Sequence, residues 1–199
     1  MVHVGQQAPD FSCSAVIAHQ QEKTLTLESL GGSYKVIFFY PADFTYVCPT
    51  ELHAFQDRYS EFEKRNTVVV GVSIDTLESH KKWLATPKEQ GGVQGITYPL
   101  IADPSRAMCK AYGVLDSKQD KALRGLCILD RQNVVQVVLI QNMSVGRNID
   151  EVLRLIDAIQ FTESHGAVCP AQWALGKEAL QPTHEGVVDY FKHQKKLVF

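Results

Sequence analysis

Two cysteines in this sequence have neighbours that could make them chemically reactive. Cys48 lies in Pro41–Leu52 (PADFTYVCPTEL), after a short apolar run and before an amphipathic one. Cys169 lies in His165–Trp173 (HGAVCPAQW), a polar stretch in which a core residue is not expected. The thiolate of a cysteine is a nucleophile, and an accessible thiol is open to oxidation. Both segments therefore predict thiol chemistry.

Cys48 is expected at the start of a helix. Pro49 follows it, and proline suits the first turn because its missing N–H would have no helical partner there. The unpaired N–H groups and the dipole of a helix N-terminus favour an anion such as a thiolate. Thr45, three residues before Cys48, could place its hydroxyl beside the sulfur.

A helix N-terminus alone does not keep a cysteine in the thiolate form. An ordinary thiol has a pKa of about 8.5, and lowering it to about 6 takes about 3.4 kcal/mol. The helix terminus contributes about 0.3–1 kcal/mol, and up to about 2 kcal/mol when partly buried. A nearby cation is therefore required, and arginine suits the role because it stays charged and presents forked donors. The spacing of the residues does not select one arginine.

The elements that must position these cysteines alternate through the first half of the chain. Lys35–Tyr40 and Val68–Ile74 are short apolar runs that predict strands buried on both faces. Apolar residues at steps of three and four predict a helix over Thr50–Lys64. Further helices are expected over Glu78–Trp83 and Pro104–Tyr112.

The second half has a different pattern. Gly125–Leu129 and Val134–Ile140 predict a β-hairpin, and Asn148–Ile159 a helix. The order predicts an α/β fold, a thioredoxin-like three-layer sandwich with a mixed central sheet, although other three-layer folds also fit. We expect a domain over residues 1–164 and an extended C-terminal arm over residues 165–199. The arm would pack on a partner subunit, the alternative being a frayed tail.

The composition is that of an ordinary globular protein. The chain has 199 residues, of which 45% are hydrophobic and 21% charged, with a formal net charge of −2. This charge gives no electrostatic case for binding nucleic acid or an anionic membrane, and no apolar run reaches the roughly 20 residues that span a bilayer. The N-terminus lacks the pattern of a secretory signal, and five scattered cysteines suit a reducing compartment, so a cytoplasmic protein is expected.

The remaining cysteines, Cys13, Cys109 and Cys127, have no acid, base or helix-start context. We interpret them as small buried hydrophobic residues. No CxxC spacing exists and the histidines are scattered, so no metal site is expected.

The two cysteine motifs resemble those of a known enzyme family. Pro41, Thr45 and Cys48 match the P-x-x-x-T-x-x-C pattern of peroxiredoxins. The string FTYVCPTEL, followed 121 residues further on by HGAVCPAQW, is similar to the typical two-cysteine members, including the bacterial alkyl hydroperoxide reductase C-type enzymes. Similar segments begin at Val4 and continue to the tail, so the resemblance covers nearly the whole chain.

The resemblance implies a thiol peroxidase that reduces hydrogen peroxide and organic hydroperoxides. Cys48 would become a sulfenic acid, and Cys169 of a second subunit would condense with it to an intersubunit disulfide. The first turn of the predicted helix would unwind for this step. Thioredoxin or a dedicated flavoprotein reductase would reduce the disulfide, with no metal, haem or flavin in this chain. A homodimer is expected, which can close into a ring of five dimers.

The same resemblance implies roles for the residues around the sulfur. Pro41 would shield it from water, and Thr45 would hydrogen-bond both the thiolate and the peroxide. Arg124 would supply the cation that the thiolate requires. Glu51 would orient the arginines, Arg147 among them.

Two motifs linked in the family to over-oxidation are partly present. Sensitive members carry a GGLG loop and a YF pair in a C-terminal helix. The pair is present here as Tyr190 and Phe191, whereas a glycine of the loop is replaced by glutamine. The corresponding loop residues are Gly91, Gly92, Val93 and Gln94. Intermediate sensitivity to over-oxidation is therefore expected.

Two other classes of function remain open. One is a thioredoxin-fold protein that handles disulfides without peroxidase activity, although the absence of CxxC argues against it. The other is a ring-forming holdase chaperone or peroxide sensor, a role that could coexist with peroxidase activity.

Overall fold

The structure is a computed structural model that describes residues 2–193. The chain divides into two compact units, Met1–Ile149 and Asp150–Phe199. Residues 194–199, the end of the predicted arm, lie outside the described part. None of the helices within residues 2–193 has both the length and the apolar character that crossing a membrane requires.

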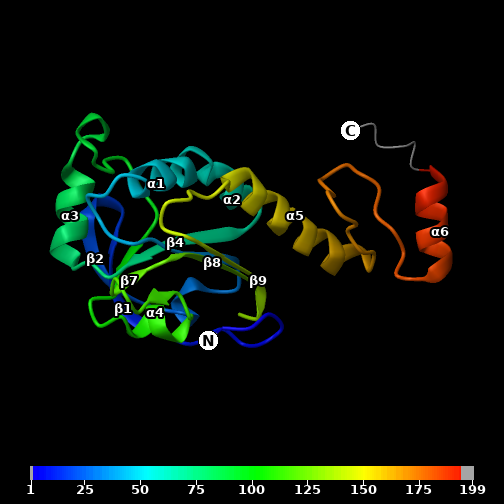
Figure 1. The fold of residues 1–199 in the computed structure, drawn as a ribbon, viewed down its shortest axis with the longest axis horizontal. Helices are drawn as coiled ribbons and strands as arrows, with labels where there is room; N and C mark the ends of the chain where they lie inside the picture. The colour runs from blue at the N-terminus through cyan, green and yellow to red at the C-terminus, as the bar shows by residue number, and fades with distance from the viewer. Residues whose placement is uncertain (1, 194–199) are drawn as a thin grey trace. The chain divides into compact units, whose positions relative to one another are not determined.

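The first unit is built on a seven-stranded mixed sheet with the order β2-β1-β5-β4-β3-β8-β9 (Figure 1). The central pairs β3–β4 and β4–β5 are parallel, and the other neighbours are antiparallel. The strands are β1 (Ser12–Ile17), β2 (Gln21–Thr26), β3 (Tyr34–Phe39), β4 (Thr67–Ser73), β5 (Leu100–Ala102), β8 (Arg124–Leu129) and β9 (Val135–Gln141). A separate ribbon pairs β6 (Leu115–Asp116) with β7 (Lys121–Ala122).

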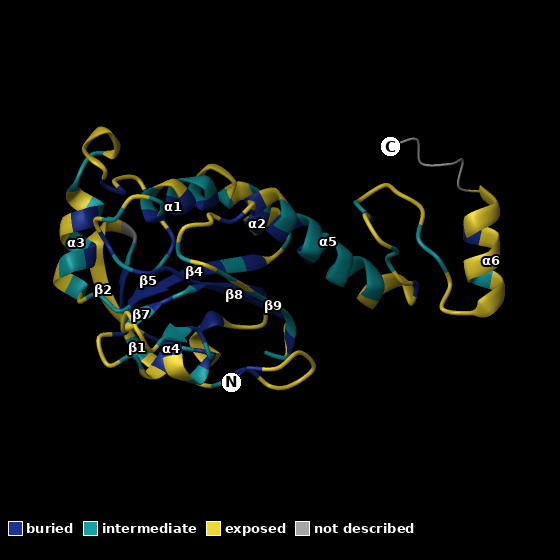
Figure 2. Cartoon of the chain, in the orientation of Figure 1, coloured by how far each residue is buried: buried dark blue, intermediate teal, exposed yellow. Residues whose placement is uncertain are grey.

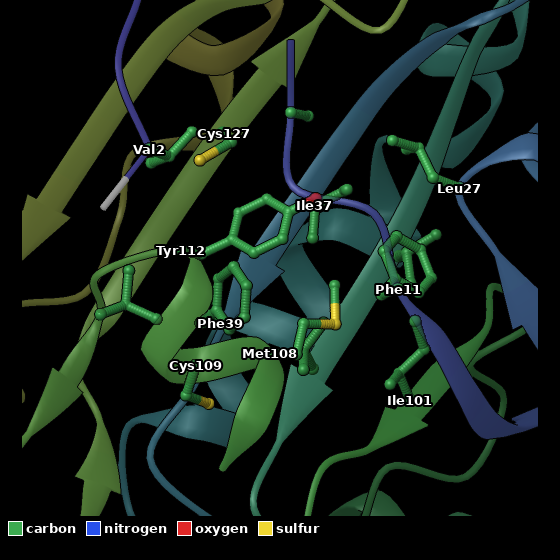
Figure 3. Packing of buried hydrophobic residues seen from close by; sticks show 14 of the residues in the cluster. Val2, Phe11, Leu27, Ile37, Phe39, Ile101, Met108, Cys109, Tyr112 and Cys127 are labelled. Atoms are coloured by element: carbon green, nitrogen blue, oxygen red, sulfur yellow. The ribbon is translucent and has the colours of Figure 1, made fainter. Parts of the chain in front are cut away.

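Helices cover both faces of this sheet. They are α1 (Cys48–Asp57), α2 (Tyr59–Lys64), α3 (Leu77–Ala85) and α4 (Ala107–Ala111), with short 3₁₀ turns at Ala18–Gln20, Glu28–Leu30 and Lys88–Gln90. On one face, the ring of Phe55 in α1 stacks on that of Phe38 in β3, with centroids 4.2 Å apart. On the other, Met108 of α4 packs in a core with Ile37 and Phe39 (Figure 3). These layers confirm the thioredoxin-like α/β sandwich.

The predicted helix over Thr50–Lys64 is wrong in its start and its continuity. The helix begins at Cys48, and it is interrupted at Arg58, which has φ −104° and ψ 6°. The Arg58 N–H bonds the Phe55 carbonyl three residues back, so the chain makes a tight turn there. Phe55 and Phe62 are fully buried on either side of the break, so the apolar periodicity continues across it.

The N-terminal hairpin β1–β2 was absent from the prediction. Strand β2 reads QEKTLT and exposes its first four residues, so it lacks the apolar run that marks a buried strand.

The predicted helix over Pro104–Tyr112 is shorter than expected and begins at Ala107. Arg106 precedes it with a left-handed backbone (φ 59°), which a helix interior does not adopt.

The second unit contains most of α5 (Ile149–His165), an irregular segment and α6 (His184–His193). A bridge between Val168 and Leu180 closes the irregular segment. Helix α6 is largely exposed, with Tyr190 as its buried residue (Figure 2).

Candidate active site

Cys48 is the first residue of α1 and lines a pocket of about 390 Å³. Four of the predicted site residues, Pro41, Thr45, Cys48 and Arg124, line this pocket together. Pro41 and Thr45 follow the carboxyl end of β3, where ligands bind in open α/β sheets. Cys48 itself is fully buried, so a reactant reaches its sulfur through the pocket.

Arg124 is the cation beside this sulfur. It begins β8, the antiparallel neighbour of β3, and its Nη1 donates to Cys48 Sγ at 3.6 Å. The same nitrogen donates to Glu51 Oε2 at 2.5 Å, and Nε donates to the Met143 carbonyl at 2.6 Å. Within residues 2–193, Arg124 Nη2 has no protein acceptor, although Arg124 lines the pocket. This leaves a charged donor available to a bound oxygen.

Glu51 holds two arginines in place. It lies one turn after Cys48 in α1, and its carboxylate accepts four hydrogen bonds. Three come from Arg147, namely from its backbone N–H, Nε and Nη2, and the fourth comes from Arg124. Arg147 Nη1 also donates to the carbonyls of Phe39 and Gly125 at the ends of β3 and β8. Glu51 therefore fixes the Arg124 guanidinium relative to the helix that carries the sulfur.

The charges in this cluster favour an anion at the sulfur. Two guanidinium groups and one carboxylate carry a net charge of +1, and all three side chains are nearly inaccessible to solvent. Buried charge is costly unless it is balanced. A thiolate at Cys48 would balance it, which agrees with the expectation that an arginine stabilises this form.

Thr45 was expected to hydrogen-bond the Cys48 thiolate, but its hydroxyl has a different partner. Its hydroxyl donates to the Ala42 carbonyl at 2.9 Å, and the part of the chain described here shows no hydrogen bond between Thr45 and Cys48. Because its hydrogen is committed to Ala42, the Thr45 oxygen presents lone pairs and can accept from a hydroperoxide O–H.

A buried network that supports the loop after β3 had not been predicted. The Asp43 carboxylate accepts from the Tyr40 hydroxyl, the Ser79 hydroxyl and His80 Nδ1 at 2.9, 2.7 and 2.8 Å. The other ring nitrogen of His80 lies 3.2 Å from the Ile101 carbonyl. Burial disfavours the imidazolium, but the hydrogen bond and charge of Asp43 outweigh it and raise the pKa of His80. No local pattern links Asp43 with His80, because they belong to different elements.

The 91–94 loop is shaped by its glycines. Gly91 has φ 76°, and a Cβ on Gly92 would lie 2.0 Å from the Thr86 carbonyl oxygen. The loop contacts α1 directly, because His53 Nε2 lies 3.1 Å from the Gly92 carbonyl. Gln94 is exposed. Tyr190 and Phe191 lie in α6, with Tyr190 buried and Phe191 65% exposed.

Cys169 lies in the irregular segment of the second unit and is partly exposed. Its sulfur lies 3.8 Å from the Ala158 carbonyl. Burial raises the pKa of Cys169, and Arg154 partly counteracts this. Arg154 is committed elsewhere, since it donates twice to Glu151 and once to the Trp173 carbonyl.

The other cysteines have environments that disfavour the thiolate. Cys109 and Cys127 are fully buried (Figure 3). Burial raises the pKa of Cys127 to about 12 and raises that of Cys109 further, with Asp103 contributing. Cys13 is half-buried, and its pKa is raised by burial and by Asp103. Across residues 2–193, no group of three or more His, Cys, Asp or Glu side chains could hold a metal ion.

Comparison with known proteins identifies the family. Residues 4–138 match the AhpC/TSA family, and residues 158–193 match the C-terminal domain of 1-Cys peroxiredoxin. Peroxiredoxin-1 of Gallus gallus is 44% identical over 192 residues, which is 96% of this chain and 96% of that protein.

Solved structures agree with this assignment. The reduced 2-Cys peroxiredoxin of Plasmodium vivax has a TM-score of 0.93 at 37% identity, and covers 96% of this chain and 100% of its own. Thioredoxin peroxidase I of Plasmodium yoelii has a TM-score of 0.78 at 40% identity, and covers 87% and 100%. The chain therefore belongs to the AhpC/TSA family of peroxiredoxins, is of the 2-Cys type, and is a thiol peroxidase.

Proposed function

We propose that Cys48 is the thiol that reacts with the hydroperoxide. The observation that carries this proposal is the hydrogen bond from Arg124 to the Cys48 sulfur inside a pocket. The thiolate attacks the terminal oxygen, so that an S–O bond forms and the O–O bond breaks. Cys48 is oxidised to sulfenic acid, and the leaving alkoxide or hydroxide takes a proton to become an alcohol or water.

Residues around the sulfur stabilise the charge that develops during this step. Arg124 lines the pocket, and its Nη2, which has no protein acceptor in the described residues, can donate to a peroxide oxygen as negative charge accumulates. The Thr45 oxygen accepts the hydroperoxide O–H, and Pro41 limits access of water to the sulfur. Glu51 and Arg147 act as positioning residues, because they hold Arg124 and α1 together.

Cys169 of a second subunit then resolves the sulfenic acid. Its thiol displaces hydroxide from sulfur, an intersubunit disulfide forms and water leaves. The first turn of α1 unwinds to expose Cys48, since the sulfur is fully buried when reduced. Residues 165–199 would serve as an arm that packs on the partner subunit, in a homodimer that can close into a ring of five dimers.

An external dithiol returns both cysteines to the thiol state. Thioredoxin is one candidate, because a structural relative is named a thioredoxin peroxidase, and a dedicated flavoprotein reductase is the alternative. Holdase and peroxide-sensor roles, intermediate sensitivity to over-oxidation and a cytoplasmic location stay predictions.

The cysteine roles can be tested on a non-reducing denaturing gel after adding one equivalent of hydrogen peroxide to reduced protein. Wild-type protein should give a band at about twice 22.2 kDa, and Cys48→Ser and Cys169→Ser should each abolish it. The matched control Cys13→Ser should keep it. Oxidised protein that stays monomeric would contradict intersubunit resolution by Cys169.

A further inference from the structure

The pocket around Cys48 is larger than hydrogen peroxide needs. Its volume is about 390 Å³, whereas a water molecule takes about 30 Å³ in the liquid. Pockets that hold organic ligands begin at about 300 Å³. Pro41, Val47 and Met143 supply apolar surface in its lining. There is room for an organic body attached to the peroxide group.

The charged side chains that line this pocket are all positive. They are Arg124 and Lys121, and no aspartate or glutamate contributes to the lining formed by the described residues. Cys48 is fully buried, whereas Lys121 is partly exposed. The sulfur is therefore the less accessible of the two groups, and Lys121 lies nearer to solvent.

The acidic neighbours of Lys121 do not form an ion pair with it. Lys121 lies directly opposite Asp116 in the β6–β7 ribbon. The Asp116 carboxylate instead accepts the N–H groups of Lys118 and Gln119 at 2.8 and 3.3 Å. Asp120 forms an ion pair with Arg106 at 2.9 Å.

Lys121 is the cation of the pocket that has no ion pair within the described residues. In the part of the chain that the structure describes, its ammonium group has no hydrogen bond or ion pair with another side chain. Arg124, in contrast, already donates to Cys48 and Glu51. A lysine ammonium with free donors in a partly apolar pocket favours an anionic group on the ligand.

We propose that Lys121 makes this pocket selective for hydroperoxides that carry a carboxylate on an organic body. The peroxide group would meet Cys48, the body would contact the apolar lining, and the carboxylate would lie by Lys121. The inference rests on the proposed peroxidatic role of Cys48, and the chemical step is unchanged. The long side chain of lysine lets the ammonium follow carboxylates at different positions along the body.

The test compares two substrates that differ only in charge, the hydroperoxide of a medium-chain carboxylic acid and the methyl ester of the same compound. The rate constant for oxidation of the reduced protein is measured for each, with hydrogen peroxide as a third substrate. Wild-type protein should react about fivefold faster with the acid than with the ester, a ratio that corresponds to one ion-pair interaction near a wet surface. The ratio should fall as salt is added.

Variants of Lys121 test whether this lysine causes the difference in rate constant between the acid and the ester. Lys121→Met keeps the length of the side chain without its charge and should bring the ratio close to one, and Lys121→Glu should reverse the preference. Lys121→Arg should retain the preference. Lys118→Met is the matched control, because Lys118 is exposed and does not line the pocket, and it should keep the wild-type ratio.

Two results would overturn the inference. They are a wild-type ratio near one, and a ratio that Lys121→Met leaves unchanged while hydrogen peroxide is still reduced. Failure of the proposed function has a different signature, since oxidation by the three substrates would then persist in the Cys48→Ser variant.

Discussion

Each of the two cysteines assigned to the reaction lies near an arginine and a glutamate, but the pairs are arranged differently. Near Cys48, Arg124 divides its donors between Glu51 and the sulfur. Near Cys169, the Arg154 guanidinium bonds Glu151 and the Trp173 carbonyl. The first arrangement places a charged donor on the sulfur, whereas the second links α5 to the segment that follows it.

The two cysteines also differ in exposure. Cys48 is fully buried yet has a charged donor on its sulfur, whereas Cys169 is partly exposed and burial still raises its pKa. The proposed order of events, with Cys48 oxidised first and Cys169 second, agrees with this difference.

Removing the cation from Cys48 should have the largest effect. Arg124→Met is expected to lower the rate constant with hydrogen peroxide at least about 100-fold, because it removes both the charge at the sulfur and a donor to the developing oxyanion. Rapid-mixing kinetics of the reduced protein measure this constant. Arg154→Met is the matched control near Cys169, and a similar loss in that variant would mean that the two arginines are not distinct in role.

Glu51→Gln tests whether the positions of the arginines matter. This change leaves two buried guanidinium groups without their carboxylate, so we expect the free energy of unfolding to fall by about 3–5 kcal/mol. The peroxide rate constant should fall by about tenfold, since Arg124 loses its anchor. Urea unfolding and rapid mixing measure the two effects. Glu151→Gln, whose ion pair is partly exposed, should cost about 1 kcal/mol or less.

Trp173→Ala should affect disulfide formation without affecting the oxidation of Cys48. Trp173 is 1% exposed, and its carbonyl accepts from Arg154 close to Cys169 in sequence. We expect disulfide formation to slow by about threefold or more as this segment loosens, with oxidation of Cys48 unaffected within about twofold. Sulfinic acid, measured by mass spectrometry during peroxide titration, should increase. An equal slowing of both steps would contradict the independence of the two regions.

The smallest expected effect concerns the buried network of Asp43 and His80, which supports the loop after β3. Because the pKa of His80 is raised in the folded state, its interaction with Asp43 stabilises the fold fully below the unfolded value of about 6.5. That stabilisation is lost as the pH rises through the folded pKa. Wild-type protein should therefore lose about 1 kcal/mol relative to His80→Gln between about pH 6 and pH 9. A pH-independent difference between the two proteins would contradict a charged His80.

The sequence predicted the parts of the site that are encoded locally. Cys48 before Pro49 marks a helix start, and the apolar run before Pro41 marks the strand that ends at the site. The need for an arginine followed from energetics, but Arg124 was assigned through the family resemblance. Spacing alone could not assign it, because β8 joins β3 through long-range pairing.

Other features depend on contacts that leave no local pattern. Asp43 and His80 meet through tertiary packing, and the exposed first four residues of β2 give this strand no apolar pattern. Lys121 has the sequence context of an ordinary surface lysine, and its proposed role rests on the pocket lining and on the lack of an ion pair with Asp116 or Asp120 in the described residues.

The most direct test of the contrast between the two regions is to locate the first oxidised sulfur. Reduced Cys169→Ser protein is treated with one equivalent of hydrogen peroxide, the sulfenic acid is trapped with a carbon nucleophile, and the adduct is mapped by mass spectrometry. We predict an adduct at Cys48 and no adduct at Cys13, Cys109 or Cys127. An adduct at another cysteine, with Cys48 unmodified, would contradict the assignment of Arg124 and Cys48 as the peroxide-reducing centre.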